Sequence, residues 1–175
     1  MSDNTKDTSS NRLILGMGIA CVLFLVWAIL WKCGVPFIGN GAERVINLLP
    51  FNHNTTWEMQ FNIAVFMPLG FYLAAYRPKL KCIQLVGVTL LVSLALEVLQ
   101  FALAIGRSDI TDLLMNTLGG SIGIVAFYGL SKLLGRHERP ATLVVCVLLT
   151  LLELYMTVSF VAFGQLNLGF MIIRL

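Results

Sequence analysis

Charged residues are scarce in this chain: Asp, Glu, Lys and Arg make up 12% of its 175 residues, whereas hydrophobic residues make up 58%. So little charge does not suit the surface of a soluble domain, and it indicates a membrane protein. Histidine occurs only twice, and the sequence has no His-Glu-x-x-His. We also expect no nucleophile elbow. Because only two histidines are present and His137 is predicted to be cytoplasmic, a histidine-dependent lipid phosphatase is not predicted.

Cysteine is also infrequent, and its placement excludes two common roles. Cys21, Cys33, Cys82 and Cys146 lack Cys-x-x-Cys spacing and have no histidines nearby. We therefore expect small apolar packing residues rather than a disulfide framework or a zinc site, and we predict no metal and no cofactor.

Long apolar runs are abundant, and a membrane-spanning helix needs about 20 mostly apolar residues. The segments that meet or approach this length are Leu13–Cys33, Gln60–Tyr76, Cys82–Ile105, Thr111–Leu134 and Ala141–Phe163. We predict an all-α, polytopic transmembrane bundle of about five spans, with the first run retained as an anchor. Residues 1–12 are predicted to be a disordered cytoplasmic tail, and 164–175 a short tail.

Lysine and arginine are unevenly shared between the two sides of this topology. One side holds Lys6, Arg12, Arg77, Lys79, Lys81, Lys132, Arg136 and Arg139, and the other holds Lys32, Arg44, Arg107 and Arg174. The positive-inside rule places the first group and the N-terminus in the cytoplasm, and the C-terminus outside. This bias accounts for the net charge of +3, so no nucleic-acid partner is expected.

Polar residues interrupt the third and fourth spans near the predicted outer face. Thr89, Ser93, Glu97 and Gln100 are spaced by four, four and three, so they share one face of a helix. Interhelical hydrogen bonding accounts for the threonine and the serine. An acid inside a membrane is costly, so Glu97 is a candidate functional residue, either neutral or paired with Arg107. Glu153, in the last span, is costly for the same reason, although its relation to this cluster is undefined.

The turn and the start of the fourth span carry further candidates. Asp109 has two readings, as the N-cap of that span or as part of a site. Arg107 pairs with one of the acids, binds a phosphate or carboxylate group, or does both in turn. The remaining candidates are Asp112 and Asn116, which share a face with Gly119 and Gly123, and also Asn62, Pro68 and Gly70 in the second span. The glycines predict close helix packing, and Pro68 predicts a kink.

Several motifs occur here in a characteristic order. They are Asn47-Leu-Leu-Pro50-Phe51, Asn62-x-x-x-Phe66-x-Pro68-x-Gly70, Glu97-x-x-Gln100, Arg107-x-Asp109-x-x-Asp112 and Asn116-x-x-Gly119 with Gly123. In this combination the chain resembles the VanZ-like membrane family over residues 40–135, which leaves the spans at 13–33 and 141–163 outside the match. The resemblance implies the bacterial cell envelope, and the family takes its name from a protein associated with low-level resistance to the lipoglycopeptide teicoplanin.

Three functional hypotheses remain open at this point. The first is a non-enzymatic protein of the bacterial plasma membrane that binds membrane lipids, a lipid-linked envelope precursor or a lipoglycopeptide at the outer polar cluster. The second is an enzyme acting on an envelope lipid, with Glu97 as acid or base and with Asp109 and Asp112 on a divalent ion. The third is a small transporter or assembly partner, although no internal repeat is evident.

Overall fold

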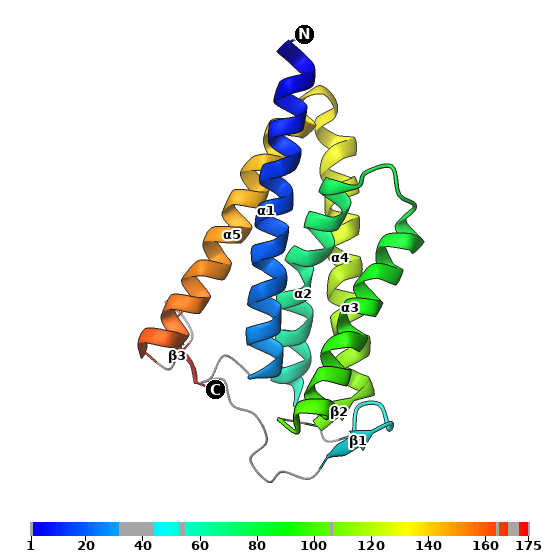
Figure 1. Ribbon diagram of the computed structural model, residues 1–175, viewed down its shortest axis with the longest axis vertical. Helices are drawn as coiled ribbons and strands as arrows, with labels where there is room; N and C mark the ends of the chain where they lie inside the picture. Colours follow the sequence, from blue (N-terminus) through cyan, green and yellow to red (C-terminus); the bar gives the residue numbers. More distant parts are fainter. Residues whose placement is uncertain are drawn as a thin grey trace.

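Five long helices make up most of the computed structural model, which describes residues 2–31, 44–52, 55–105, 107–163, 165–167 and 172–174. They are α1 (Ser2–Leu30), α2 (Thr56–Tyr76), α3 (Cys82–Leu103), α4 (Ile110–Leu134) and α5 (Glu138–Phe163), with a 3-10 turn, η1 (Gly135–His137), between the last two. Successive helices run in opposite directions (Figure 1). The predicted all-α bundle is therefore confirmed.

Four stretches of the described chain are long and apolar enough to cross a membrane. The fourth, Ile110–Ala162, contains both α4 and α5, which fold back on each other at η1 (Figure 1). Each of these two helices exceeds the roughly 20 residues that a crossing requires. The prediction of about five spans agrees with this arrangement.

The ends of two helices differ from the sequence-based prediction. Helix α2 begins at Thr56, before the predicted Gln60, because Thr55 and Glu58 form a capping box that satisfies the first backbone N–H groups. Helix α1 begins at Ser2, where residues 1–12 were predicted to be disordered. A helix already nucleated in an apolar span extends at low cost, which accounts for this difference. Cys33 and Lys32 lie outside the described residues.

Two very short sheets were not predicted. Strand β1 (Val45–Asn47) pairs in parallel with β2 (Arg107–Asp109), so that Asn47 lies opposite Asp109. In the C-terminal segment, β3 (Gln165–Asn167) pairs antiparallel with β4 (Ile172–Arg174). Backbone groups in connections need hydrogen-bond partners just as those in helices do, and these ladders supply them.

Glycines bring α2 and α4 into direct backbone contact. A Cβ atom at Gly119 would overlap the carbonyl oxygen of Ile63, and one at Gly123 would overlap that of Met67. Gly70 of α2 similarly faces the backbone of Gly120. Close approach of two membrane helices through small residues gives tight packing without a hydrophobic driving force. Pro68 lies buried inside α2, and the predicted kink there stays a prediction.

A cluster of polar side chains lies where α1, α2 and α5 meet. The Tyr72 hydroxyl of α2 donates to the Cys146 carbonyl of α5 at 3.0 Å and lies 2.7 Å from the Thr150 hydroxyl. Glu153, one turn further along α5, is buried beside Cys21 of α1. These contacts join α1 and α5 to the α2–α4 pair.

The two ends of the bundle differ in composition. The start of α1, the α2–α3 turn and η1 lie at one end, and β1 and β2 lie at the other (Figure 1). The first end carries the described basic residues Arg77, Lys79, Lys81, Lys132 and Arg136. The second end carries the polar turn between α3 and α4.

Candidate functional site

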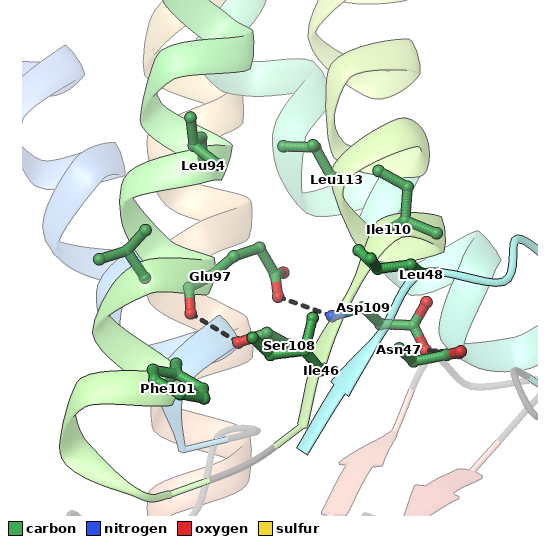
Figure 2. A pocket seen from close by; sticks show the side chains of 11 residues that line it. Ile46, Asn47, Leu48, Leu94, Glu97, Phe101, Ser108, Asp109, Ile110 and Leu113 are labelled. Atoms are coloured by element: carbon green, nitrogen blue, oxygen red, sulfur yellow. Dashed lines mark hydrogen bonds between the residues drawn. The ribbon is translucent and has the colours of Figure 1, made fainter. Parts of the chain in front are cut away.

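Glu97 lies at the centre of the polar turn, near the end of α3. It is only 6% exposed, and its Oε2 atom accepts a hydrogen bond from the backbone N–H of Asp109 at 3.0 Å. The Ser108 hydroxyl donates to the Glu97 carbonyl at 2.8 Å, so two bonds fasten β2 to the last turns of α3 (Figure 2). The other carboxyl oxygen, Oε1, is buried without a partner among the described residues.

Asp109 is the N-cap of α4. Its Oδ1 accepts from the Thr111 N–H at 2.8 Å, and its Oδ2 accepts from the Asn47 side-chain amide at 2.8 Å. Of the acids proposed for Arg107, Asp109 is the one it reaches, at 3.4 Å. Burial by itself raises the pKa of Asp109, but the bonds from Asn47 and Thr111, together with Arg107, outweigh it and hold that pKa below its ordinary value.

Hydrogen bonds hold the segment before α2, residues 44–52, against this turn. Besides Asp109, the Asn47 amide reaches the carbonyl of Asn52 at 3.1 Å, and Asn47 Oδ1 accepts from the Leu49 N–H at 3.2 Å. The Phe51 N–H donates to the Thr111 hydroxyl at 2.9 Å. Asn47 therefore joins segments that are far apart in the sequence. It belongs to the Asn47–Phe51 motif, which was the available signal for it.

A pocket of about 260 Å³ opens between β1, α3 and the start of α4. Figure 2 shows the Glu97 side chain reaching from α3 toward Asp109, with Leu94 and Leu113 on one side and Ile46 and Phe101 on the other. The remaining lining residues are Asn47, Leu48, Val98, Ser108, Asp109 and Ile110. The walls are thus mainly aliphatic, with a few polar groups placed among them, as is usual for sites that bind small molecules.

Four of the predicted site residues lie outside this lining. The Asn62 amide donates to Asp112 at 2.8 Å and ties α2 to α4. The Asn116 amide donates to the Ser93 hydroxyl at 3.0 Å and ties α4 to α3. The Gln100 amide donates to the Ile29 carbonyl at 2.9 Å, at the end of α1. The predicted cluster therefore separates into a pocket around Glu97 and a set of interhelical bonds.

Arg107 also stands apart from the pocket lining. Its side chain is 39% exposed, whereas that of its partner Asp109 is 1% exposed. It therefore lies at the surface of the turn, where it can meet a group outside the bundle.

Two chemical motifs can be compared with the geometry of the described residues. No group of three His, Cys, Asp or Glu side chains within the described ranges is close enough to hold a metal ion. Residues 119–123 match the Gly-x-Ser-x-Gly pattern. However, Ser121 lies inside α4, and its hydroxyl donates to the Thr117 carbonyl at 2.7 Å. A nucleophile elbow requires a strand-to-helix turn, which is absent there. His137 lies on η1, at the opposite end of the bundle (Figure 1).

Comparison with known proteins agrees with the resemblance noted from the motifs. The VanZ/LLP1 family model matches residues 18–135, which extends beyond the predicted 40–135 and takes in the C-terminal part of α1, from Gly18 to Leu30. The chain is 33% identical over 155 residues to Protein VanZ of Enterococcus faecium, an alignment that covers 82% of this chain and 94% of that protein. No solved structure gives a significant match. The chain therefore belongs to the VanZ/LLP1 family.

Proposed function

We propose that this protein lies in the bacterial plasma membrane and lowers susceptibility to teicoplanin by binding a lipid-linked or amphiphilic ligand in the pocket around Glu97. Family membership supports the membrane setting, and the association of the family name with teicoplanin resistance supports the choice of antibiotic. The protein acts in this proposal by binding, without a chemical step.

The pocket between β1, α3 and α4 is the observation that carries the proposal. Its walls are largely Leu, Ile, Val and Phe, while a buried carboxyl lies inside it. Apolar walls suit an alkyl or acyl chain, and a few placed polar groups fix the orientation of a head group. An amphiphile already dissolved in the bilayer would reach such a pocket from the side.

The pocket faces outward in this proposal. The basic residues of the α2–α3 turn and of η1 mark the other end of the bundle, and positive residues favour the cytoplasmic side. The N-terminus is then cytoplasmic and the C-terminus extracytoplasmic. The pocket lies at the depth of the outer leaflet, where an envelope precursor or a lipoglycopeptide is found.

The other candidate residues take supporting roles. Arg107, partly exposed beside Asp109, contacts an anionic group of the ligand, because a guanidinium can exchange one carboxylate partner for another. Asn62, Asp112 and Asn116 hold α2, α3 and α4 in register. Gln100 holds the end of α1 against α3.

Expression in a glycopeptide-sensitive Gram-positive host tests this proposal. We expect the wild-type protein to raise the inhibitory concentration of teicoplanin and to leave that of vancomycin, which lacks an acyl chain, unchanged. Arg107→Ala and Glu97→Gln are expected to return the teicoplanin value toward that of the empty vector. Lys132→Ala, at the opposite end of the bundle, is expected to retain protection.

Membrane abundance of each variant must be measured, because loss of protein would imitate loss of function. If Arg107→Ala and Glu97→Gln both keep the protection at equal membrane abundance, the polar turn is excluded as the site. Absence of protection by the wild type would exclude the teicoplanin role for this member of the family.

A further inference from the structure

One buried oxygen in the pocket lacks a hydrogen-bond partner. Each polar side chain that lines the pocket, Asn47, Glu97, Ser108 and Asp109, makes at least one bond within the protein. Oε1 of Glu97 is nevertheless buried and unbonded among the described residues. Leaving a buried polar atom unsatisfied typically costs about 1–3 kcal/mol, and more for a charged group. Other buried side-chain oxygens among the described residues, such as those of Gln100, Asn116 and Glu153, also have no partner, but of these residues only Glu97 lines the pocket.

The position of this oxygen limits what can satisfy it. The residue is 94% buried, being only 6% exposed, and it stands in the pocket wall with Leu94 and Val98 on the same helix. Its other oxygen, Oε2, accepts a hydrogen bond from the Asp109 N–H. The partner must therefore arrive through the pocket, next to aliphatic side chains.

The chemistry of the oxygen limits the partner further. A carboxylate oxygen accepts hydrogen bonds, and Oε2 of Glu97 already accepts one from the Asp109 N–H. The second acid of the lining, Asp109, already pairs with Arg107 outside the pocket. An anionic group brought to Glu97 would meet two carboxylates, whereas an N–H donor would complete the one missing bond.

We propose that the pocket selects amphiphiles whose alkyl or acyl chain joins the head group through an N–H that donates to Glu97 Oε1. This inference rests on the proposed function and names the ligand class for the same pocket. The chain lies against Leu94, Val98 and Leu113, the linking N–H lies at Glu97, and any negative charge of the ligand lies outward, at Arg107.

A matched pair of probes isolates the N–H. N-dodecylacetamide and dodecyl acetate differ only by N–H in place of oxygen, and each is made with a photoreactive diazirine in its chain. The purified full-length protein in lipid nanodiscs is labelled at low probe concentration, and the labelled peptides are identified by mass spectrometry. We expect the amide to label the segments around Leu94–Phe101 and Ile110–Leu113 about tenfold more than the ester, which corresponds to about 1.4 kcal/mol.

Glu97→Gln reverses the polarity of the site without changing its size. The Gln oxygen keeps the bond from the Asp109 N–H, so its NH₂ takes the place of Oε1 and donates rather than accepts. We expect the preference for the amide to disappear in this variant. Glu153→Gln changes a buried acid that lies outside the pocket, beside Cys21, and this variant is expected to keep the full preference.

The outcomes separate the two proposals. Labelling of these segments by neither probe overturns the proposed function itself. Equal labelling by both probes, in the wild type and in Glu97→Gln, supports a ligand pocket but overturns selection through the N–H. Stronger labelling by a dodecyl phosphate probe than by the amide also overturns it.

Competition identifies where the ligand comes from. Displacement of the amide probe by teicoplanin, which carries an N-acyl chain, supports the antibiotic as the source. Displacement only by lipid extracted from the native membrane supports a resident amide-linked lipid instead. If neither displaces the probe, the assignment of this ligand class is overturned.

Discussion

Replacing Gly119 by alanine is expected to destabilise the bundle by about 1–3 kcal/mol, the usual cost of overpacking a tight interior. The added Cβ would overlap the backbone carbonyl of Ile63, and a backbone cannot rotate away as a flexible side chain can. Helices α2 and α4 must then separate along their contact, which the Asn62–Asp112 bond also spans. Thermal unfolding of the purified protein in detergent measures the effect.

Gly129→Ala supplies the matched control on the same helix. A Cβ at Gly129 has no heavy atom within 4 Å, so nothing opposes it. Alanine favours helix over glycine by about 1 kcal/mol, so this variant is expected to be as stable as the wild type or slightly more stable. Equal stability of Gly119→Ala and Gly129→Ala would contradict the described α2–α4 packing.

Asp109→Ala is expected to detach the connection before α2 from the start of α4. The change removes an N-cap, worth about 0.5–2 kcal/mol. It also removes the bond from Asn47, and a bond to a charged group is worth about 1.5–3 kcal/mol. Because Asn47 and Asp109 both line the pocket, ligand binding should fall as well. Hydrogen–deuterium exchange measures the opening, as faster exchange of the amides in segments 44–52 and 107–112.

Lowering the pH tests how much the negative charge of Asp109 contributes to this stability. Its pKa is lowered in the folded protein, so its carboxylate adds stability that is fully present above the ordinary aspartate pKa of about 3.9. That stability is lost as the pH falls through the lower, folded pKa. We expect exchange in 44–52 to rise in this acid range for the wild type but not for Asp109→Asn, which can still cap α4. The same acid response in both proteins would assign it to another group.

The helices were predictable because their signals are local. Apolar runs of spanning length predicted the bundle, and the spacing of Thr89, Ser93, Glu97 and Gln100 predicted one shared face, all of which the structure buries. The early start of α2 was also encoded locally, in Thr55 and Glu58, but hydropathy alone does not detect a capping box.

The pocket was not predictable because it depends on contacts between distant segments. Asn47 and Asp109 are 62 positions apart, and their bond depends on the parallel register of β1 and β2. Strands of three residues carry too little periodicity to predict that register. The partition of the polar residues likewise depends on tertiary packing. Asp112 and Asn116 share a helix face, yet one meets α2 and the other meets α3.

Direct binding of teicoplanin to the purified protein tests the central claim, that the pocket around Glu97 holds the ligand. Leu94→Trp fills the pocket, and Leu91→Trp, nearly one turn away on α3, is the control because Leu91 does not line it. Both leucines are exposed, at 45% and 65%, so the bundle should tolerate either tryptophan. We expect Leu94→Trp to weaken binding at least about tenfold, or about 1.4 kcal/mol, and Leu91→Trp to bind like the wild type. Wild-type affinity in Leu94→Trp, with the protein folded, would contradict the claim.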